Sequence, residues 1–216
     1  MHLPASWRQP RVSQLEFIIK DLVRKQLSQS VETITAVLND QSIHEAVVQA
    51  GRLTAEAMQA GRKLMVCGNG GSAADSQHLV AEFVSRLTVD RPALRAIALT
   101  TDSSILTAIG NDYSYDNVFE RQVEALGLEG DVLLAISTSG NSKNCIKALK
   151  LARNMGIHTV SYTGNGGGAM KALSEINVIV PSNITMNIQE SHLALEHIFC
   201  MIVERCYFGP EFGATT

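Results

Sequence analysis

The stretch "LMVCGNGGSAADS" (residues 64–76) runs from an apolar segment through a glycine-rich loop into the start of a helix. "LLAISTSGNSKNC" (residues 133–145) repeats that order with a loop of Ser, Thr, Gly and Asn. Units of this kind are typical of a parallel sheet covered by helices, and ligands bind at the carboxyl ends of its strands. The two stretches therefore predict an α/β fold with a ligand site beside both loops.

The remainder of the chain continues the alternation of short apolar runs with helical segments. The predicted strands are residues 63–67, 95–99, 132–136, 158–162 and 177–181. The predicted helices that follow or separate them are residues 72–87, 103–109, 115–126, 142–155, 168–173 and 187–206. Strands that alternate with helices pair in parallel and are covered on both faces. We expect a three-layer αβα sandwich with a five-stranded parallel sheet.

Two further helices precede the first strand. Apolar residues between positions 12 and 39 recur every three or four residues, which predicts a long amphipathic helix; they are Ile19, Val23, Leu27, Val31, Ile34 and Leu38. The second helix is predicted over 42–60, with Ser42 as its N-cap and Gly61 after its end. The apolar stripe of the first helix must pack on the sheet or on another subunit. We divide the chain into an N-terminal extension with an oligomerisation helix (1–40) and one domain (41–216).

Composition and charge exclude several classes of protein. The chain has 216 residues, 45% of them hydrophobic, and a formal charge of −3, which is ordinary for a globular protein and offers no basic surface for nucleic acid. No stretch approaches the about 18 apolar residues that span a membrane, and the N-terminus lacks a signal-peptide run. The four cysteines contain no C-x-x-C pair. We expect a cytoplasmic, reduced protein that binds neither nucleic acid nor membrane.

The second loop carries an unusual density of hydroxyl groups. Four hydroxyl groups fall within six residues just before a predicted helix; they belong to Ser137, Thr138, Ser139 and Ser142. A helix N-terminus and hydroxyl donors together suit the oxygens of a phosphate. Serine and threonine also serve as plain caps and turn formers. The position after a buried type of strand favours the phosphate interpretation.

The first loop also matches the relaxed dinucleotide pattern G-x-G-x-x-A, at Gly68, Gly70 and Ala73. An enzyme that binds a nicotinamide cofactor should carry an acidic residue about 20 positions later, after the second strand. The first acidic residue after that strand, Asp102, comes more than 30 residues after the loop, and the chain has no Walker lysine pattern. A sugar monophosphate therefore fits these loops better than a nucleotide.

Two helices carry residues that suit proton transfer or metal binding. A nitrogen and oxygen donor set suits zinc, and the candidates are His78, Glu82, Gln189 and His197. The first two are four residues apart and share a helix face, although such a pair is often a simple surface hydrogen bond. On the last helix, His192 and Glu196 form a competing pair that spacing cannot rank below the other two. The sequence leaves this choice open.

Five stretches together resemble the phosphoheptose isomerases, or sedoheptulose 7-phosphate isomerases, of the sugar isomerase (SIS) domain superfamily. They are "CGNGGSAADSQHLVAE" (67–82), "AIGNDYSYDNVFERQV" (108–123), "GDVLLAISTSGNSKN" (130–144), "YTGNGGGAM" (162–170) and "IQESHLALEH" (188–197). The similarity covers about residues 61–203, while the first ten residues look like an unmatched extension. The resemblance implies a flavodoxin-like SIS domain and a homotetramer with active sites at subunit boundaries.

The resemblance also implies roles for individual residues. Glu82 corresponds to the base that acts on the sugar carbon through an enediolate, and His197 to its acid–base partner. A zinc site corresponds to His78, Glu82, Gln189 and His197. Substrate contacts correspond to Asn69, Gly70, Gly71, Ser72, Asp112, Ser137, Thr138, Ser139, Ser142 and Gln189. Many relatives carry arginine where this chain has Asn187, which concerns the charge around the sugar tail and not the reaction.

The implied reaction is the isomerisation of D-sedoheptulose 7-phosphate to D-glycero-D-manno-heptose 7-phosphate, the entry to bacterial surface heptose. Two alternatives compete with it. Some SIS proteins are non-catalytic regulators, including one that binds a replication initiator, and these are expected to lack the glutamate and histidine pair. The presence of Glu82 and His197 favours an enzyme over such a regulator. The other alternative is isomerisation of a different sugar phosphate, because the loops recognise phosphate more clearly than chain length.

Overall fold

A computed structural model describes residues 12–212, so the first ten residues, which look like an unmatched extension, lie outside the described residues. Its centre is one five-stranded parallel sheet with the strand order β2-β1-β3-β4-β5. The strands are β1 (Leu64–Gly68), β2 (Ala96–Ala98), β3 (Val132–Ser137), β4 (His158–Thr163) and β5 (Ile176–Ile179). This topology confirms the predicted α/β fold with a parallel five-stranded sheet.

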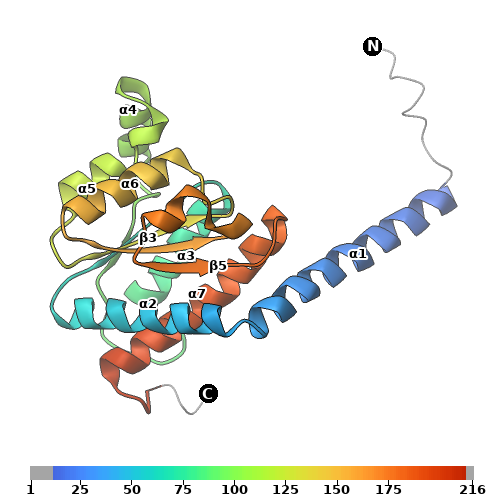
Figure 1. Ribbon diagram of the computed structural model, residues 1–216, viewed down its shortest axis with the longest axis horizontal. Coiled ribbons are helices and arrows are strands. Elements are labelled where there is room, and N and C mark those ends of the chain that lie inside the picture. Colours follow the sequence, from blue (N-terminus) through green and yellow to red (C-terminus); the bar gives the residue numbers. More distant parts are fainter. Residues whose placement is uncertain (1–11, 213–216) are drawn as a thin grey trace.

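Helices cover both faces of the sheet, as predicted (Figure 1). The helical elements are α1 (Val12–Leu38), α2 (Gln41–Gln59), α3 (Gly71–Val84), α4 (Ser103–Asp112), η2 (Tyr115–Asn117), α5 (Glu120–Leu126), α6 (Lys143–Asn154), η3 (Asn165–Ala172) and α7 (Thr185–Phe208). Leu64 and Val66 of β1 pack with α2, α3 and α7 on one face. Met65 and Cys67 alternate to the other face and pack with α5 and α6. The core therefore consists of two apolar layers, one on each side of the sheet.

The strand order reverses between β1 and β3. These two central strands are fully buried and pair in parallel, with Gly68 opposite Ile136 at their carboxyl ends. The chain leaves β1 toward one edge of the sheet and passes from β3 to the other edge. Ligands bind outside the carboxyl ends of strands at such a reversal. Both loops singled out in the sequence follow these two strands.

Two local predictions were wrong. The N-cap of α2 is Asp40 and not Ser42, because the Asp40 carboxylate accepts hydrogen bonds from the Ser42 backbone N–H (2.9 Å) and from its hydroxyl (2.6 Å). The helix predicted over 168–173 is instead the 3-10 element η3, which begins earlier. Gly166, Gly167 and Gly168 within it have φ of 70°, 97° and 53°, so the chain cannot form a regular helix there.

Helix α1 projects from the body of the molecule, and its last turns lie near α7 (Figure 1). The Gln26 side-chain amide donates to the Asn187 side-chain oxygen of α7 at 2.8 Å. Large apolar side chains of α1 remain exposed, including Leu22 (61%), Leu27 (62%) and Val31 (64%). The predicted apolar stripe therefore has no cover within the described part of a single chain. Among residues 12–212, no helix combines the length and apolar content needed to cross a membrane.

Candidate functional site

The glycine-rich loop after β1 leads directly into α3. Gly70 is the N-cap of this helix and has φ of 57°, a conformation that strains residues with a side chain. Ser72, in the first turn, is buried. A Cβ added to Gly71 would lie 2.3 Å from the side-chain amide of Gln189, so a larger residue here would displace that amide. The free backbone N–H groups of the first turn suit an anion.

The hydroxyl-rich loop after β3 is held in a compact shape by its own side chains. The Ser137 hydroxyl lies 2.8 Å from that of Ser142, the N-cap of α6, and 3.4 Å from that of Ser139. The backbone carbonyl of Thr138 accepts from the N–H of Gly164 at 3.1 Å, which joins this loop to the end of β4. The structure thus brings three of the four predicted hydroxyls together at the start of α6.

Asn69 connects the two loops with the segment after α4. Its side-chain amide and that of Asn144 exchange hydrogen bonds at 2.8 and 2.9 Å, and the Tyr115 hydroxyl donates to the Asn69 oxygen at 3.1 Å. Asp112 lies at the end of α4, where it is exposed and accepts from the neighbouring Asn111. Among residues 12–212, the Asp112 side chain makes no hydrogen bond to another predicted site residue. Neither Asn144 nor Tyr115 was predicted, because no spacing rule relates them to Asn69.

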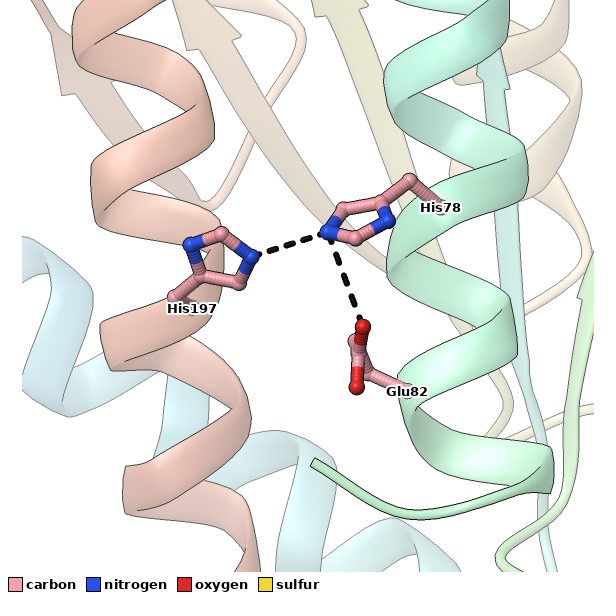
Figure 2. A group of neighbouring side chains, drawn as sticks. All are labelled: His78, Glu82 and His197. Carbon is pink, nitrogen blue, oxygen red and sulfur yellow. Dashed lines mark hydrogen bonds and ion pairs between the residues drawn. The ribbon is translucent and has the colours of Figure 1, made fainter. Parts of the chain in front are cut away.

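Three predicted residues from α3 and α7 converge on one another (Figure 2). The Nε2 atom of His78 lies 2.8 Å from Nε2 of His197 and 3.6 Å from Oε1 of Glu82. The two imidazole rings meet edge to face, with centroids 5.0 Å apart. One potential ligand atom from each residue lies within 4.8 Å of the others. We call His78, Glu82 and His197 the triad.

The triad fits a divalent metal ion in its donor chemistry. Two imidazole nitrogens and one carboxylate form a common three-ligand set for catalytic zinc, which keeps a fourth position open. The two ring nitrogens at 2.8 Å share a proton in a hydrogen bond, since two lone pairs would repel. The side chains of His78 and Glu82 are 42% and 17% exposed, so the triad is accessible. These residues could hold a metal.

Gln189 lies on α7 and contacts α3 about one helical turn before His78. Its side-chain amide donates to Oδ1 of Asp75 at 3.2 Å. Asp75 is three residues before His78 and seven before Glu82, so all three share one face of α3. Burial raises the pKa of the Asp75 carboxyl. Asp75 was not among the predicted site residues, although helical spacing from Glu82 could have identified it.

The competing pair on α7 faces the protein interior. His192 is fully buried, its Nε2 bonds the Thr163 carbonyl at 3.1 Å, and burial lowers its pKa to about 4. Glu196 is also fully buried, and burial together with the nearby Asp75 charge raises its pKa to about 8. Both are neutral at pH 7 and belong to the core. The structure brings His197, and not this pair, to His78.

Comparisons with known proteins identify relatives over most of the chain. The SIS domain family matches residues 27–164. A phosphoheptose isomerase of Akkermansia muciniphila is 55% identical over 163 residues, which cover 76% of this chain and 86% of that protein. One of Clostridium acetobutylicum is 49% identical over 193 residues, covering 89% and 98% respectively. The solved structure of a phosphoheptose isomerase from Neisseria gonorrhoeae has a TM-score of 0.81 at 41% identity, covering 86% of this chain and 98% of that one.

Proposed function

The chain belongs to the phosphoheptose isomerase family of SIS-domain proteins and is an isomerase, and we propose that the triad and the two loops form its active site. The reaction is the intramolecular oxidoreduction of D-sedoheptulose 7-phosphate to D-glycero-D-manno-heptose 7-phosphate. It supplies heptose for bacterial surface polysaccharides. The observation that carries the proposal is the convergence of two imidazoles with the Glu82 carboxylate, which lies on a helix that begins at a glycine loop suited to phosphate.

Glu82 is the proposed base. A ketose becomes an aldose when a base removes a proton from C1, which leaves an enediolate across C1 and C2, and the proton is then returned to C2. One carboxylate on one face of the sugar can remove the proton and return it. His197 moves the second proton between the O1 and O2 oxygens, which keeps the charge on the enediolate low. His78 hydrogen-bonds to His197 and orients its ring.

Four residues would hold a zinc ion: His78, Glu82, Gln189 and His197. The short distances between the three residues of the triad support their part in this site. A bound zinc ion supplies Lewis-acid polarisation of the carbonyl and enediolate oxygens. Coordination would keep Glu82 ionised and oriented, at some cost to its basicity. Gln189 is held by Asp75 beside the first turn of α3, between the glycine loop and the triad.

The phosphate and the sugar tail would bind at the carboxyl ends of β1 and β3. Phosphate ligands are Ser72, Ser137, Thr138, Ser139 and Ser142, and the N-termini of α3 and α6 add free N–H groups. The remainder of the substrate would contact five further residues: Asn69, Gly70, Gly71, Asp112 and Gln189. Asn187, where many relatives carry arginine, is buried and bonded to Gln26, so here it joins α1 to α7.

The proposed assembly is a homotetramer whose active sites lie at subunit boundaries. The exposed apolar stripe of α1 supports this, because an isolated chain would leave that stripe in water. The accessible side chain of His78 leaves room for a neighbouring subunit over the triad. We further propose residues 1–40 as the extension and oligomerisation unit, residues 41–216 as the SIS domain, and the cytoplasm as the location.

A panel of ketose phosphates tests the function. Purified protein is incubated with five-, six- and seven-carbon ketose phosphates, and the aldose phosphate formed is measured by a coupled assay. We expect the largest kcat/KM for the seven-carbon substrate. A preference for a shorter sugar would establish a different sugar phosphate isomerase. No turnover of any sugar, together with binding to a replication initiator, would establish the regulator instead.

A further inference from the structure

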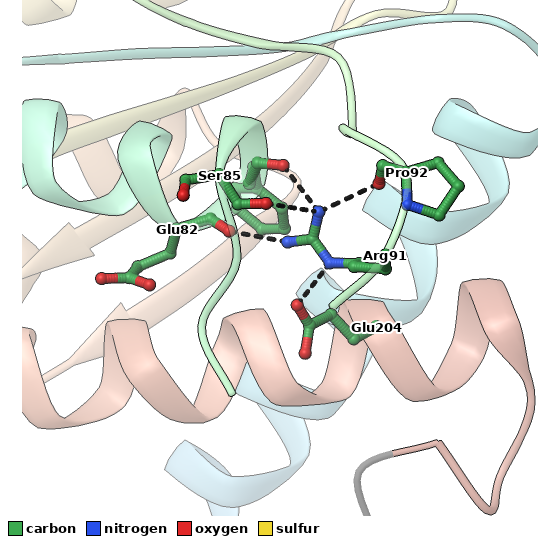
Figure 3. Close-up of polar contacts among 6 residues, drawn as sticks. Glu82, Ser85, Arg91, Pro92 and Glu204 are labelled. Carbon is green, nitrogen blue, oxygen red and sulfur yellow. Dashed lines mark hydrogen bonds and ion pairs between the residues drawn. The ribbon is translucent and has the colours of Figure 1, made fainter. Parts of the chain in front are cut away.

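Arg91 lies in the connection between α3 and β2, and its side chain is only 1% exposed (Figure 3). Its Nε donates to Oε1 of Glu204 on α7 at 2.6 Å, and the Glu204 side chain is 3% exposed. Its Nη2 donates to the backbone carbonyl of Glu82 at 2.6 Å, and its Nη1 to that of Phe83 at 2.8 Å. One guanidinium therefore bonds two helices at once.

These contacts satisfy the end of the helix that carries Glu82. The last four carbonyl groups of a helix lack partners within the helix and carry partial negative charge. Arg91 supplies donors and a positive charge to two of these carbonyls. The planar fork of arginine can reach a carboxylate and two carbonyls together, whereas the ammonium group of lysine offers no fixed fork.

The other end of the contact lies on the α7 face that carries His197. Glu204 is seven residues after His197, which is about two helical turns, so both side chains project from nearly the same face. That face packs against α3, as the His78 and Arg91 contacts show. Arg91 therefore joins the backbone of Glu82 to the helix face that presents His197.

We propose that Arg91 is a positioning residue, which with Glu204 fixes the end of α3 against α7 and thereby sets the position of Glu82 relative to His197. This inference rests on the proposed function of the triad. A buried ion pair is not needed for stability alone, because apolar residues of similar volume often stabilise as well or better. Apolar residues could not bond the two carbonyls at the end of α3.

Three variants test the proposal against a merely stabilising role. For Arg91→Met we expect kcat to fall about 10- to 100-fold, because sub-ångström to ångström displacements of catalytic groups have effects of this size. KM should change less than about twofold, since the phosphate loops lie at the other end of α3. Arg91→Lys should restore little of the loss. The double variant Arg91→Met/Glu204→Leu should be more stable than Arg91→Met. Its kcat should remain as low as that of Arg91→Met.

Leu149→Ala is the matched control, because Leu149 is a buried residue of α6 on the opposite face of the sheet. It should lose stability in urea unfolding while keeping kcat at temperatures where it is folded. The imidazole NMR signals of His78 and His197 provide a readout that needs no turnover. They should shift in Arg91→Met and in Arg91→Met/Glu204→Leu and stay unchanged in the control.

Wild-type kcat in Arg91→Met, or recovery of kcat in the double variant in step with stability, would overturn the proposal. Unchanged imidazole signals in both variants would overturn it as well. If the wild-type protein isomerises no sugar phosphate, the proposed function fails, and the imidazole signals still decide whether Arg91 positions the triad. The two failures are therefore distinguishable.

Discussion

The Nε2 atoms of His78 and His197 lie 2.8 Å apart, although 119 residues separate them in the chain. They meet because α3 and α7 pack side by side on the same face of the sheet. Glu82 joins them from one turn further along α3. The proposed chemistry therefore depends on how these two helices are held together.

Replacing Glu82 with Gln should keep the fold and lower kcat by about a thousandfold or more, because the amide cannot accept the proton from C1. A loss of this size is expected when a general base is removed. The fold should remain because the glutamine amide occupies nearly the same volume as the glutamate carboxylate. The measurement is kcat for the seven-carbon ketose phosphate, with thermal unfolding as the check on the fold. Glu124→Gln, at an exposed glutamate of α5, is the control and should remain fully active. Near-normal turnover by the Glu82 variant would refute the assignment.

Metal removal should separate activity from folding. A chelator is expected to lower kcat at least tenfold, and added Zn²⁺ should restore it, while unfolding shifts little because the triad lies at an accessible surface. His78→Gln should lower the zinc bound per chain, measured by elemental analysis after dialysis. His158→Gln is the control, since His158 is another exposed histidine with a carboxylate partner, Glu175. Full zinc content in the His78 variant would exclude the triad as the metal site.

His192 should make the protein sensitive to acid. Burial lowers its pKa from 6.5 to about 4, so between these values the unfolded chain binds a proton that the folded chain excludes. Stability from this group is therefore complete above pH 6.5 and is lost as the pH falls toward 4, by about 2 kcal/mol at pH 5. His192→Gln should be less stable at pH 8 but show a smaller further loss at pH 5.

The measurement is the free energy of unfolding in urea at both pH values. His158→Gln is again the control and should keep the wild-type difference between pH 8 and pH 5, because its ring lies at the surface. An equal acid loss in wild type and the His192 variant would show that this buried imidazole does not determine the acid sensitivity.

Charge on the apolar stripe of α1 should break the assembly. Leu27→Glu places a carboxylate where we expect contact with another subunit, so light scattering should report smaller species for the variant than for the wild type. If neighbouring subunits complete the active sites, the loss of assembly should also lower kcat. Lys25→Glu, at an exposed polar position of the same helix, should leave the assembly intact. A wild-type protein that is a fully active monomer would contradict the proposed assembly.

The sequence by itself determined the layered α/β fold and the nature of the two loops. Buried parallel strands need continuous apolar runs such as 132–136, and helices need spacings of three and four, so local patterns are sufficient. The same reasoning placed His78 and Glu82 on one helix face. These features depend on neighbours within one element, which a sequence displays directly.

Only the tertiary structure decided which residues of α7 meet α3. His192 and Glu196 have the same spacing as many ligand pairs, yet the packing of α7 on the sheet buries them and leaves His197 beside His78. Spacing describes one helix and contains no information on its rotation against another. Arg91 was missed for the same reason: its partners, Glu82 and Glu204, are brought to it by packing between helices far apart in the chain.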